Sequence, residues 1–145
     1  MTEELLLATK ADMDLLFEWA NDDEVRKNSF STAKISYENH VKWFEKLLER
    51  GDCKQYIFYV DGVAVGQVRV TIEDEKAEIG YSICASGRGK GYAKKMIQLL
   101  TEQLKKDAPW VKTLVAKVKP ENIASQKVFL GLEYKETYRQ YEIEI

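Results

Sequence analysis

The fold is decided by the stretch Arg88-Gly89-Lys90-Gly91-Tyr92-Ala93, which stands where the periodicity of the sequence changes from strand to helix. Residues 77–83 alternate apolar and polar side chains, whereas apolar residues at positions 93, 97, 100 and 104 recur at helical spacing. Glycines at such a turn let the backbone approach a ligand closely, and the free N–H groups and dipole of a helix start attract anions. The stretch therefore predicts an anion-binding turn between a strand and a helix.

Outward from this turn, the sequence predicts a mixed sheet. Upstream, residues 56–60 and 67–72 flank the turn pair Asp61-Gly62, which predicts a hairpin and, with residues 77–83, an antiparallel meander. Downstream, the helix leads to a strand over residues 111–118, so the unit is typical of a right-handed crossover between parallel strands. Residues 122–130 then predict a short helix, and the alternation within residues 134–145 predicts one or two final strands.

The amino-terminal part predicts a strand and two helices. Residues 5–8 form an apolar run, and Thr9 followed by Asp12 is an acidic variant of the pattern that caps helices. Ser36 is placed to cap a second amphipathic helix, which Gly51 ends. We expect one domain, residues 1–145, of the α/β (α+β) class, with a mixed, mostly antiparallel central sheet flanked by helices.

Composition excludes several classes of function. The 22 Lys and Arg residues against 24 Asp and Glu give a net charge of -2, which argues against a dedicated binder of nucleic acid or of an anionic membrane. Two cysteines, Cys53 and Cys84, are too few for a disulfide scaffold or a zinc site, so we expect no metal. An acidic amino terminus and the lack of a long apolar segment predict a cytoplasmic protein.

The glycine-rich turn by itself leaves its ligand open. It could be a tight turn without a ligand, or an Arg/Gly segment that contacts RNA. A Walker phosphate loop is excluded because the Gly-Lys-Ser/Thr ending is absent. A dinucleotide fingerprint fits poorly because the turn follows an antiparallel meander and not an initial β-α-β unit.

With a second motif downstream, the turn resembles the GNAT superfamily of acyl-CoA N-acyltransferases. Arg88, Gly91 and Ala93 match its pyrophosphate signature, Gln/Arg-x-x-Gly-x-Gly/Ala, and Asn122-Ile123-Ala124-Ser125 matches the start of the helix beside the pantetheine arm. The resemblance implies a GNAT-like fold with acetyl-CoA as co-substrate, main-chain pairing of the strand end with pantetheine, and N–H contacts of the turn with pyrophosphate. The coenzyme-binding residues that it implies are Ile83, Cys84, Arg88, Gly89, Lys90, Gly91, Tyr92, Ala93, Asn122 and Ser125.

For catalysis, the resemblance implies direct transfer of an acetyl group to a primary amine, with Glu78 as general base and substrate contact. The alternative for Glu78 is an exposed carboxylate on a strand. Many relatives carry a tyrosine as the proton donor where this chain has Phe129, so Ser125 is the first substitute and Tyr134 the next, with Tyr138 beside it. Cys84 is interpreted as a packing residue and not as an acyl carrier.

Residues 19–30, together with His40 and Trp43, resemble the subgroup that acetylates nucleotide-linked amino sugars in surface-glycan pathways of the pseudaminic-acid type. In that subgroup the region flanks the acceptor cleft, which implies that Asn21, Arg26 and His40 bind substrate. The structural alternative is that Asn21 ends a helix and that His40 is an ordinary residue of an amphipathic helix.

Three functions follow from these residues and stay open at this point. The first is an acetyl-CoA-dependent N-acetyltransferase for a small-molecule amine. The second is acetylation of a protein amino terminus, as in the ribosomal-protein acetyltransferases, for which an open peptide groove would be the sign. The third, from another class, is a non-catalytic acyl-CoA sensor, for which Phe129 is the argument. A homodimer is the assembly we keep open, and neither nucleic acid nor a membrane is expected as a partner.

Overall fold

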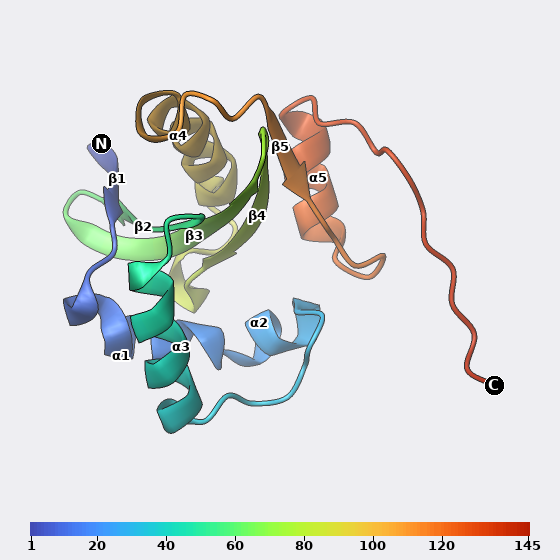
Figure 1. Ribbon diagram of the computed structural model, residues 1–145, viewed down its shortest axis with the longest axis horizontal. Helices are drawn as coiled ribbons and strands as arrows, with labels where there is room; N and C mark the ends of the chain where they lie inside the picture. Colours follow the sequence, from blue (N-terminus) through green and yellow to red (C-terminus); the bar gives the residue numbers. More distant parts are fainter.

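The computed structural model describes residues 1–145 and has a single five-stranded sheet with helices on both faces (Figure 1). The strands are β1 (Glu3–Leu7), β2 (Cys53–Val60), β3 (Val63–Glu73), β4 (Lys76–Ile83) and β5 (Thr113–Ala116). The helices are α1 (Met13–Ala20), α2 (Asp23–Asn28), α3 (Tyr37–Glu49), α4 (Tyr92–Asp107) and α5 (Ile123–Gly131), with short 3-10 turns at Lys10–Asp12 and Ala85–Gly87. The predicted fold class is confirmed.

The strands lie in sequence order, β1-β2-β3-β4-β5, and all neighbours are antiparallel except the parallel pair of β4 and β5. Side chains alternate between the two faces of the sheet, so each face has its own hydrophobic core. Val68 and Val70 point to the face that α4 covers with Met96 and Ile97. Ile57 of β2 points to the opposite face, where it joins the cluster of α1 and α3. No helix is long and apolar enough to cross a membrane.

The local signals predicted at helix starts are confirmed. The Thr9 side chain accepts a hydrogen bond from the Ala11 N–H, and the Asp12 carboxylate accepts one from the Thr9 N–H at 2.8 Å, which completes a capping box. The Ser36 hydroxyl accepts from the Asn39 N–H at the start of α3. These caps satisfy donors that a helix start leaves free.

The prediction of strands in residues 134–145 is wrong. The chain after α5 forms no helix or strand and runs away from the sheet (Figure 1). Its apolar side chains, including Tyr141 and Ile143, are exposed. Alternation expresses a preference for extended backbone, but a strand also needs a neighbouring edge for its hydrogen bonds, and the tail meets none in this chain. β5 is likewise shorter than the predicted residues 111–118, and α2 is a short helix that the sequence did not predict.

One feature of the sheet positions the site. β5 pairs with β4 only from Lys76 to Ile79, although β4 continues to Ile83. The two parallel strands therefore separate towards the carboxyl end of β4, which leaves one side of its last residues without a neighbour. The glycine-rich turn and the start of α4 follow directly.

Candidate active site

The turn between β4 and α4 offers a row of free main-chain donors. The backbone N–H groups of residues 89–94 donate to no acceptor within the chain. Gly89 and Gly91 both have φ of 77°, a left-handed conformation that L side chains rarely adopt, and a Cβ at either position would meet nothing within 4 Å. Convergent free N–H groups beside open space, at the positive end of a 16-residue helix, suit a polyanion such as a pyrophosphate.

The end of β4 supplies further free main-chain groups. The Cys84 N–H donates to the Val65 carbonyl on β3 at 2.8 Å, so this amide is already used. Hydrogen-bonding direction alternates along an antiparallel strand, so the main-chain groups of Tyr81 and Ile83 point the other way, into the gap beside β5. The geometry thus favours Ile83 and Tyr81, and not the N–H of Cys84, as strand-like partners for an extended amide ligand.

The start of α5 forms the opposite wall of this gap. The Asn122 side chain caps the helix by accepting from the Ser125 N–H at 3.2 Å. The Ser125 hydroxyl is buried and accepts a hydrogen bond from the Tyr81 hydroxyl at 2.8 Å, across from β4. Burial raises the pKa of Tyr81, so the phenol keeps its proton at neutral pH. Because Tyr81 donates to it, Ser125 retains its own proton for another acceptor.

The predicted base, Glu78, lies on β4 on the same face as Gly80 and Ser82. Its carboxylate is half-exposed and lies 2.8 Å from the Lys117 ammonium, just beyond β5. The hydrogen bond and charge of Glu78 raise the pKa of Lys117. Glu78 and Lys117 both line the cleft described below.

The tyrosines proposed as proton donors occupy two different environments. Tyr134 packs on Phe129 with ring centroids 5.0 Å apart, and its hydroxyl is buried without a hydrogen-bond partner. Burial raises the pKa of Tyr134. Tyr138 is exposed on the tail and lines the cleft. Phe129 also packs edge-on against Tyr81, so the ring at the usual tyrosine position supports the hydroxyl that bonds to Ser125.

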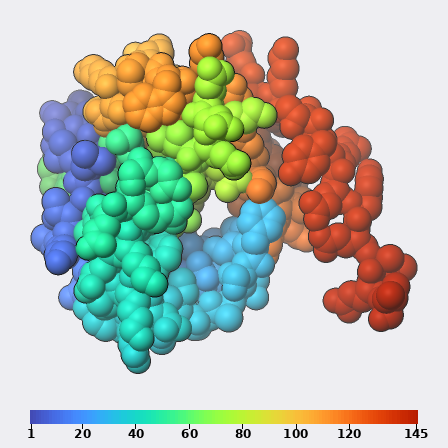
Figure 2. All heavy atoms as spheres, viewed as in Figure 1, coloured from blue at the N-terminus to red at the C-terminus, as the bar shows by residue number.

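A long cleft joins these groups. It has a volume of about 1130 Å³ and runs from the glycine turn and the start of α5, along β3 and β4, to α2. Figure 2 shows it as an open hollow between α2, β4 and the segment that precedes α5. A hydrogen bond from the Lys119 ammonium to the Lys27 carbonyl, at 3.1 Å, bridges its rim. No group of side chains that could hold a metal ion occurs.

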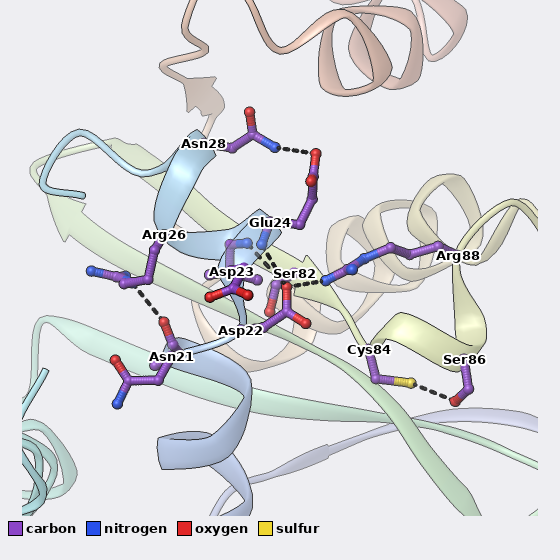
Figure 3. Close-up of polar contacts among 12 residues, drawn as sticks. Asn21, Asp22, Asp23, Glu24, Arg26, Asn28, Ser82, Cys84, Ser86 and Arg88 are labelled. Carbon is purple, nitrogen blue, oxygen red and sulfur yellow. Dashed lines mark hydrogen bonds and ion pairs between the residues drawn. The ribbon is translucent and has the colours of Figure 1, made fainter. Parts of the chain in front are cut away.

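One ion pair links the glycine turn to α2 (Figure 3). The Arg88 guanidinium donates to the Asp22 carboxylate at 2.7 Å, and the same carboxylate caps α2 by accepting from the N–H groups of Glu24 and Val25. Burial alone would raise the pKa of Asp22, but the hydrogen bond and charge of Arg88 hold it below its usual value. Arg88 therefore positions α2 over the cleft.

Arg26, predicted to bind substrate, uses its guanidinium for hydrogen bonds within the chain. Its Nε donates to the Ala20 carbonyl at 2.6 Å (Figure 3), and its two terminal nitrogens donate to the carbonyls of Ser31 and Ala33 and to the Ser29 hydroxyl. The guanidinium thus closes the loop after α2. It has no share in the lining of the cleft.

Asn21 and His40 are engaged in the same way. The Asn21 amide nitrogen donates to the Ile35 carbonyl, and its oxygen accepts from the Ile35 N–H, both at 2.8 Å. His40 is buried, and its Nε2 donates to the Met13 carbonyl at 2.9 Å beside the ring of Phe17. The structure brings none of the three side chains to the large cleft. Asn21 lines a smaller pocket of about 380 Å³ beside Cys84 and Arg88, but Arg26 and His40 do not, so no pocket is bordered by all three.

Several residues of the cleft could not be assigned to the site from the sequence. Arg69 and Gln67 on β3 share the face of Glu78, and Tyr81 bonds to Ser125. Arg69 could have been suspected, since it alternates with apolar residues on a predicted strand and so marks the polar face of the meander. The role of Lys117 depends on how β5 lies beside β4, which no local pattern encodes.

The parallel-strand gap, the free donors and the helix that follows are the features of an enzyme that holds an acyl-coenzyme and transfers its acyl group to an amine. The family model described as "Acetyltransferase (GNAT) domain" matches residues 4–135. The chain belongs to this GNAT family and is an N-acetyltransferase. A search of curated proteins by sequence finds no match.

Solved structures agree on the fold. A domain from Methanocaldococcus jannaschii DSM 2661 superposes with a TM-score of 0.82 at 24% identity, covering 97% of this chain and 93% of that chain. The aminoglycoside acetyltransferase AAC(6')-Ib, in complex with coenzyme A, gives 0.81 at 18%, covering 94% and 86%. RimL, an alpha-N-protein acetyltransferase of a ribosomal protein, also in complex with coenzyme A, gives 0.78 at 21%, covering 90% and 78%.

Proposed function

We propose that this acetyltransferase takes its acetyl group from acetyl-CoA and transfers it directly to a primary amine bound in the cleft. The observation that best supports this proposal is the row of free N–H groups at residues 89–94, which lies directly after the unpaired end of β4. Residues 89–94 would hold the pyrophosphate, Tyr81 and Ile83 would pair with the pantetheine amides, and Asn122 and Ser125 would flank the arm. When bound, the thioester supplies the activated acetyl group.

The chain's own residues divide the remaining tasks. An amine must be neutral to attack, and Glu78, with Lys117 at 2.8 Å, is placed to accept its proton directly or through water. The leaving thiolate needs a hydrogen-bond donor, and Ser125 can turn its free proton towards it while Tyr81 donates to Ser125 Oγ. Tyr134 is the second candidate donor, since its buried hydroxyl has no other partner.

The acceptor that we propose first is a small-molecule amine, with a nucleotide-linked amino sugar as the finer hypothesis. Basic side chains outnumber acidic ones along the cleft by five to three, although the whole chain carries a net charge of -2, which suits an acceptor with phosphates. A peptide amino terminus is the second candidate because the cleft is open in Figure 2. Homodimer formation remains a prediction, to be measured by light scattering.

The proposal is tested by measuring enzymatic turnover. Purified protein is incubated with acetyl-CoA and a panel of aminoglycosides, UDP-linked amino sugars and short peptides with free amino termini, while thiol release and coenzyme A binding are measured. Release that depends on one class of amine supports the proposal and identifies that class. Tight binding of coenzyme A without turnover of any amine would instead favour a sensor. Failure to bind coenzyme A would overturn the proposal.

A further inference from the structure

Arg69 stands out among the basic residues of the cleft because its charge has no partner in the chain. It lies in the middle of β3, opposite Gly80 on β4, and its side chain is mostly buried. No side-chain hydrogen bond or ion pair engages its guanidinium. Lys27 and Lys94, the other basic residues there without an ion pair, are exposed to solvent. None of its nitrogens is fully buried without a partner, so its donors reach the cleft, where the anion of a ligand can replace water.

Two neighbours hold this guanidinium in place. The Trp43 ring of α3 lies 4.9 Å from the guanidinium carbon, in a cation–π contact. On the other side lies Gly80 of β4, where an added Cβ would be in ordinary contact with the Arg69 terminal nitrogen at 3.7 Å, so the guanidinium lies close over β4. Neither contact supplies a hydrogen-bond acceptor. The planar donor group is therefore held with its N–H groups unused.

No neighbouring carboxylate forms an ion pair with Arg69, although the charge of Glu78 partly offsets the lowering of its pKa by burial. Glu78, on the same face of the sheet, is paired with Lys117 at 2.8 Å. Asp52 lies just before β2 and is paired with Arg50 at 2.9 Å. Gln55, opposite Arg69 on β2, uses its amide nitrogen on Gln67 and on backbone carbonyls. Burial lowers the pKa of Arg69, as expected for a cation removed from water.

We propose that Arg69 is the anchor for an anionic group, a phosphate or a carboxylate, on the acceptor amine. The inference rests on the proposed function and deepens it. Two parallel N–H donors of a fixed guanidinium match the geometry of either anion. The anchor and the Glu78–Lys117 pair lie on one face of the sheet, so the acceptor would present its anion to one and its amine to the other. An unneutralised cation here disfavours polycationic aminoglycosides, in contrast to AAC(6')-Ib.

The first experiment compares matched amines. Glucosamine 6-phosphate is compared with glucosamine, and β-alanine with β-alaninamide, in the wild type, Arg69→Gln and Arg69→Lys. We expect the anionic member to have the higher kcat/KM, and Arg69→Gln to reduce that preference about 30-fold, mostly through KM, as loss of charged hydrogen bonds implies. Arg69→Lys should recover part of the preference. The two pairs distinguish phosphate from carboxylate.

The control is Lys105→Gln, which removes an exposed cation that is paired with Glu102 on α4 outside the cleft. It should leave the preference unchanged. Equal use of anionic and neutral amines by the wild type, or equal losses for both members in Arg69→Gln, would overturn the proposal. Circular dichroism and a melting curve show whether Arg69→Gln is folded. If Arg69→Gln is not folded, the proposal is tested by the substrate preference of Arg69→Lys and by inhibition of the wild type by free anions.

A second readout does not depend on turnover. Inorganic phosphate and succinate are titrated into protein saturated with coenzyme A, which would occupy the glycine turn. The signal is intrinsic fluorescence in a protein that keeps Trp43 but carries Trp19→Phe and Trp110→Phe. Saturable quenching in the wild type and in Lys105→Gln, weakened at least about tenfold in Arg69→Gln, supports the anchor. No saturable binding in the wild type contradicts it. If coenzyme A itself does not bind, the proposed function fails, and the titration without coenzyme A still tests Arg69.

Discussion

The turn at residues 88–94 and the helix α2 with its flanking loops face each other across the cleft, yet they use their polar groups in opposite ways. In the turn, the main-chain N–H groups of residues 89–94 have no partner in the chain. Around α2, the side chains predicted to bind substrate are already satisfied, with Arg26 donating to three carbonyls and Asn21 pairing twice with Ile35. Free donors mark a place for a ligand, whereas satisfied donors mark a scaffold.

This contrast teaches where polar residues acquire their roles. A glycine turn before a helix leaves donors free because of backbone geometry alone, so its role is contained in the local sequence. A long side chain such as Arg26 can reach a ligand or a carbonyl equally well, and only the tertiary structure decides.

Gly91→Val should abolish most coenzyme A binding. At φ of 77°, a β-branched residue is strained by at least 1–2 kcal/mol, roughly the cost of the left-handed conformation, and its side chain would enter the open space that the N–H groups face. We expect a loss of affinity of about 100-fold, or ~3 kcal/mol, measured by isothermal titration calorimetry.

Its matched control is Gly51→Ala. Gly51 also has open space around its Cβ position but no positive φ, and it lies after α3, away from the turn. This variant should bind coenzyme A as the wild type does. If Gly91→Val also retained full affinity, the free donors of the turn would not be the coenzyme site.

Arg26→Ala should affect stability and not coenzyme binding. Removing a guanidinium that bonds to the carbonyls of Ala20, Ser31 and Ala33 should cost about 2 kcal/mol in the free energy of unfolding. Urea denaturation measures this change. Arg50→Ala, which breaks an exposed pair with Asp52, serves as control and should show no clear change. A stable Arg26→Ala with impaired kcat/KM would mean that α2 contacts substrate through Arg26 and that the contrast is wrong.

The sequence contained most of the fold and the main-chain part of the site. The hairpin at Asp61-Gly62, the caps at Thr9 and Ser36 and the crossover from β4 to β5 follow from local chemistry and chain order, and all are observed. The free donors of the glycine turn were also predictable, because they depend on backbone conformation and not on remote partners.

The remainder depended on contacts between distant segments. His40 had the residue type of a substrate contact, but packing of α3 against α1 directs its ring to the Met13 carbonyl. Arg69 and Tyr81 follow the ordinary alternation of their strands. Only the tertiary structure shows that Arg69 contacts Trp43 of α3 and that Tyr81 bonds to Ser125 of α5. In the tail, the alternation of residues 141–145 predicted a strand that has no edge to join.

Ser125→Ala tests a side chain on the coenzyme wall, where the contrast predicts a chemical and not a structural effect. Loss of the proposed hydrogen bond to the leaving thiolate should reduce kcat about tenfold while the KM for acetyl-CoA stays within about threefold. Tyr81→Phe, which leaves Ser125 in place without its donor, should show a smaller loss in the same direction. If Ser125→Ala is fully active and Tyr134→Phe is not, Tyr134 is the proton donor.

The smallest effect concerns Arg88 and Asp22, the one ion pair that joins the two regions. Asp22→Asn keeps a residue that caps helices well but removes the charge, so α2 should stay folded. The pKa of Asp22 is lowered in the folded state, so its contribution is present above the unfolded pKa of about 3.9 and is lost as the pH falls through the folded value. The wild type should exceed Asp22→Asn in stability by less than about 1 kcal/mol at pH 7, and high salt should reduce the difference.

In acid, below the folded pKa of Asp22, the two proteins should unfold at the same urea concentration. Coenzyme A affinity should change by less than about threefold at pH 7, because the main-chain N–H groups, and not the position of Arg88, are proposed to hold the pyrophosphate. A loss as large as that of Gly91→Val would show that α2 orders the turn through this bridge. The free donors and the satisfied scaffold would then form a single unit, and acceptor binding at α2 would be expected to alter coenzyme affinity.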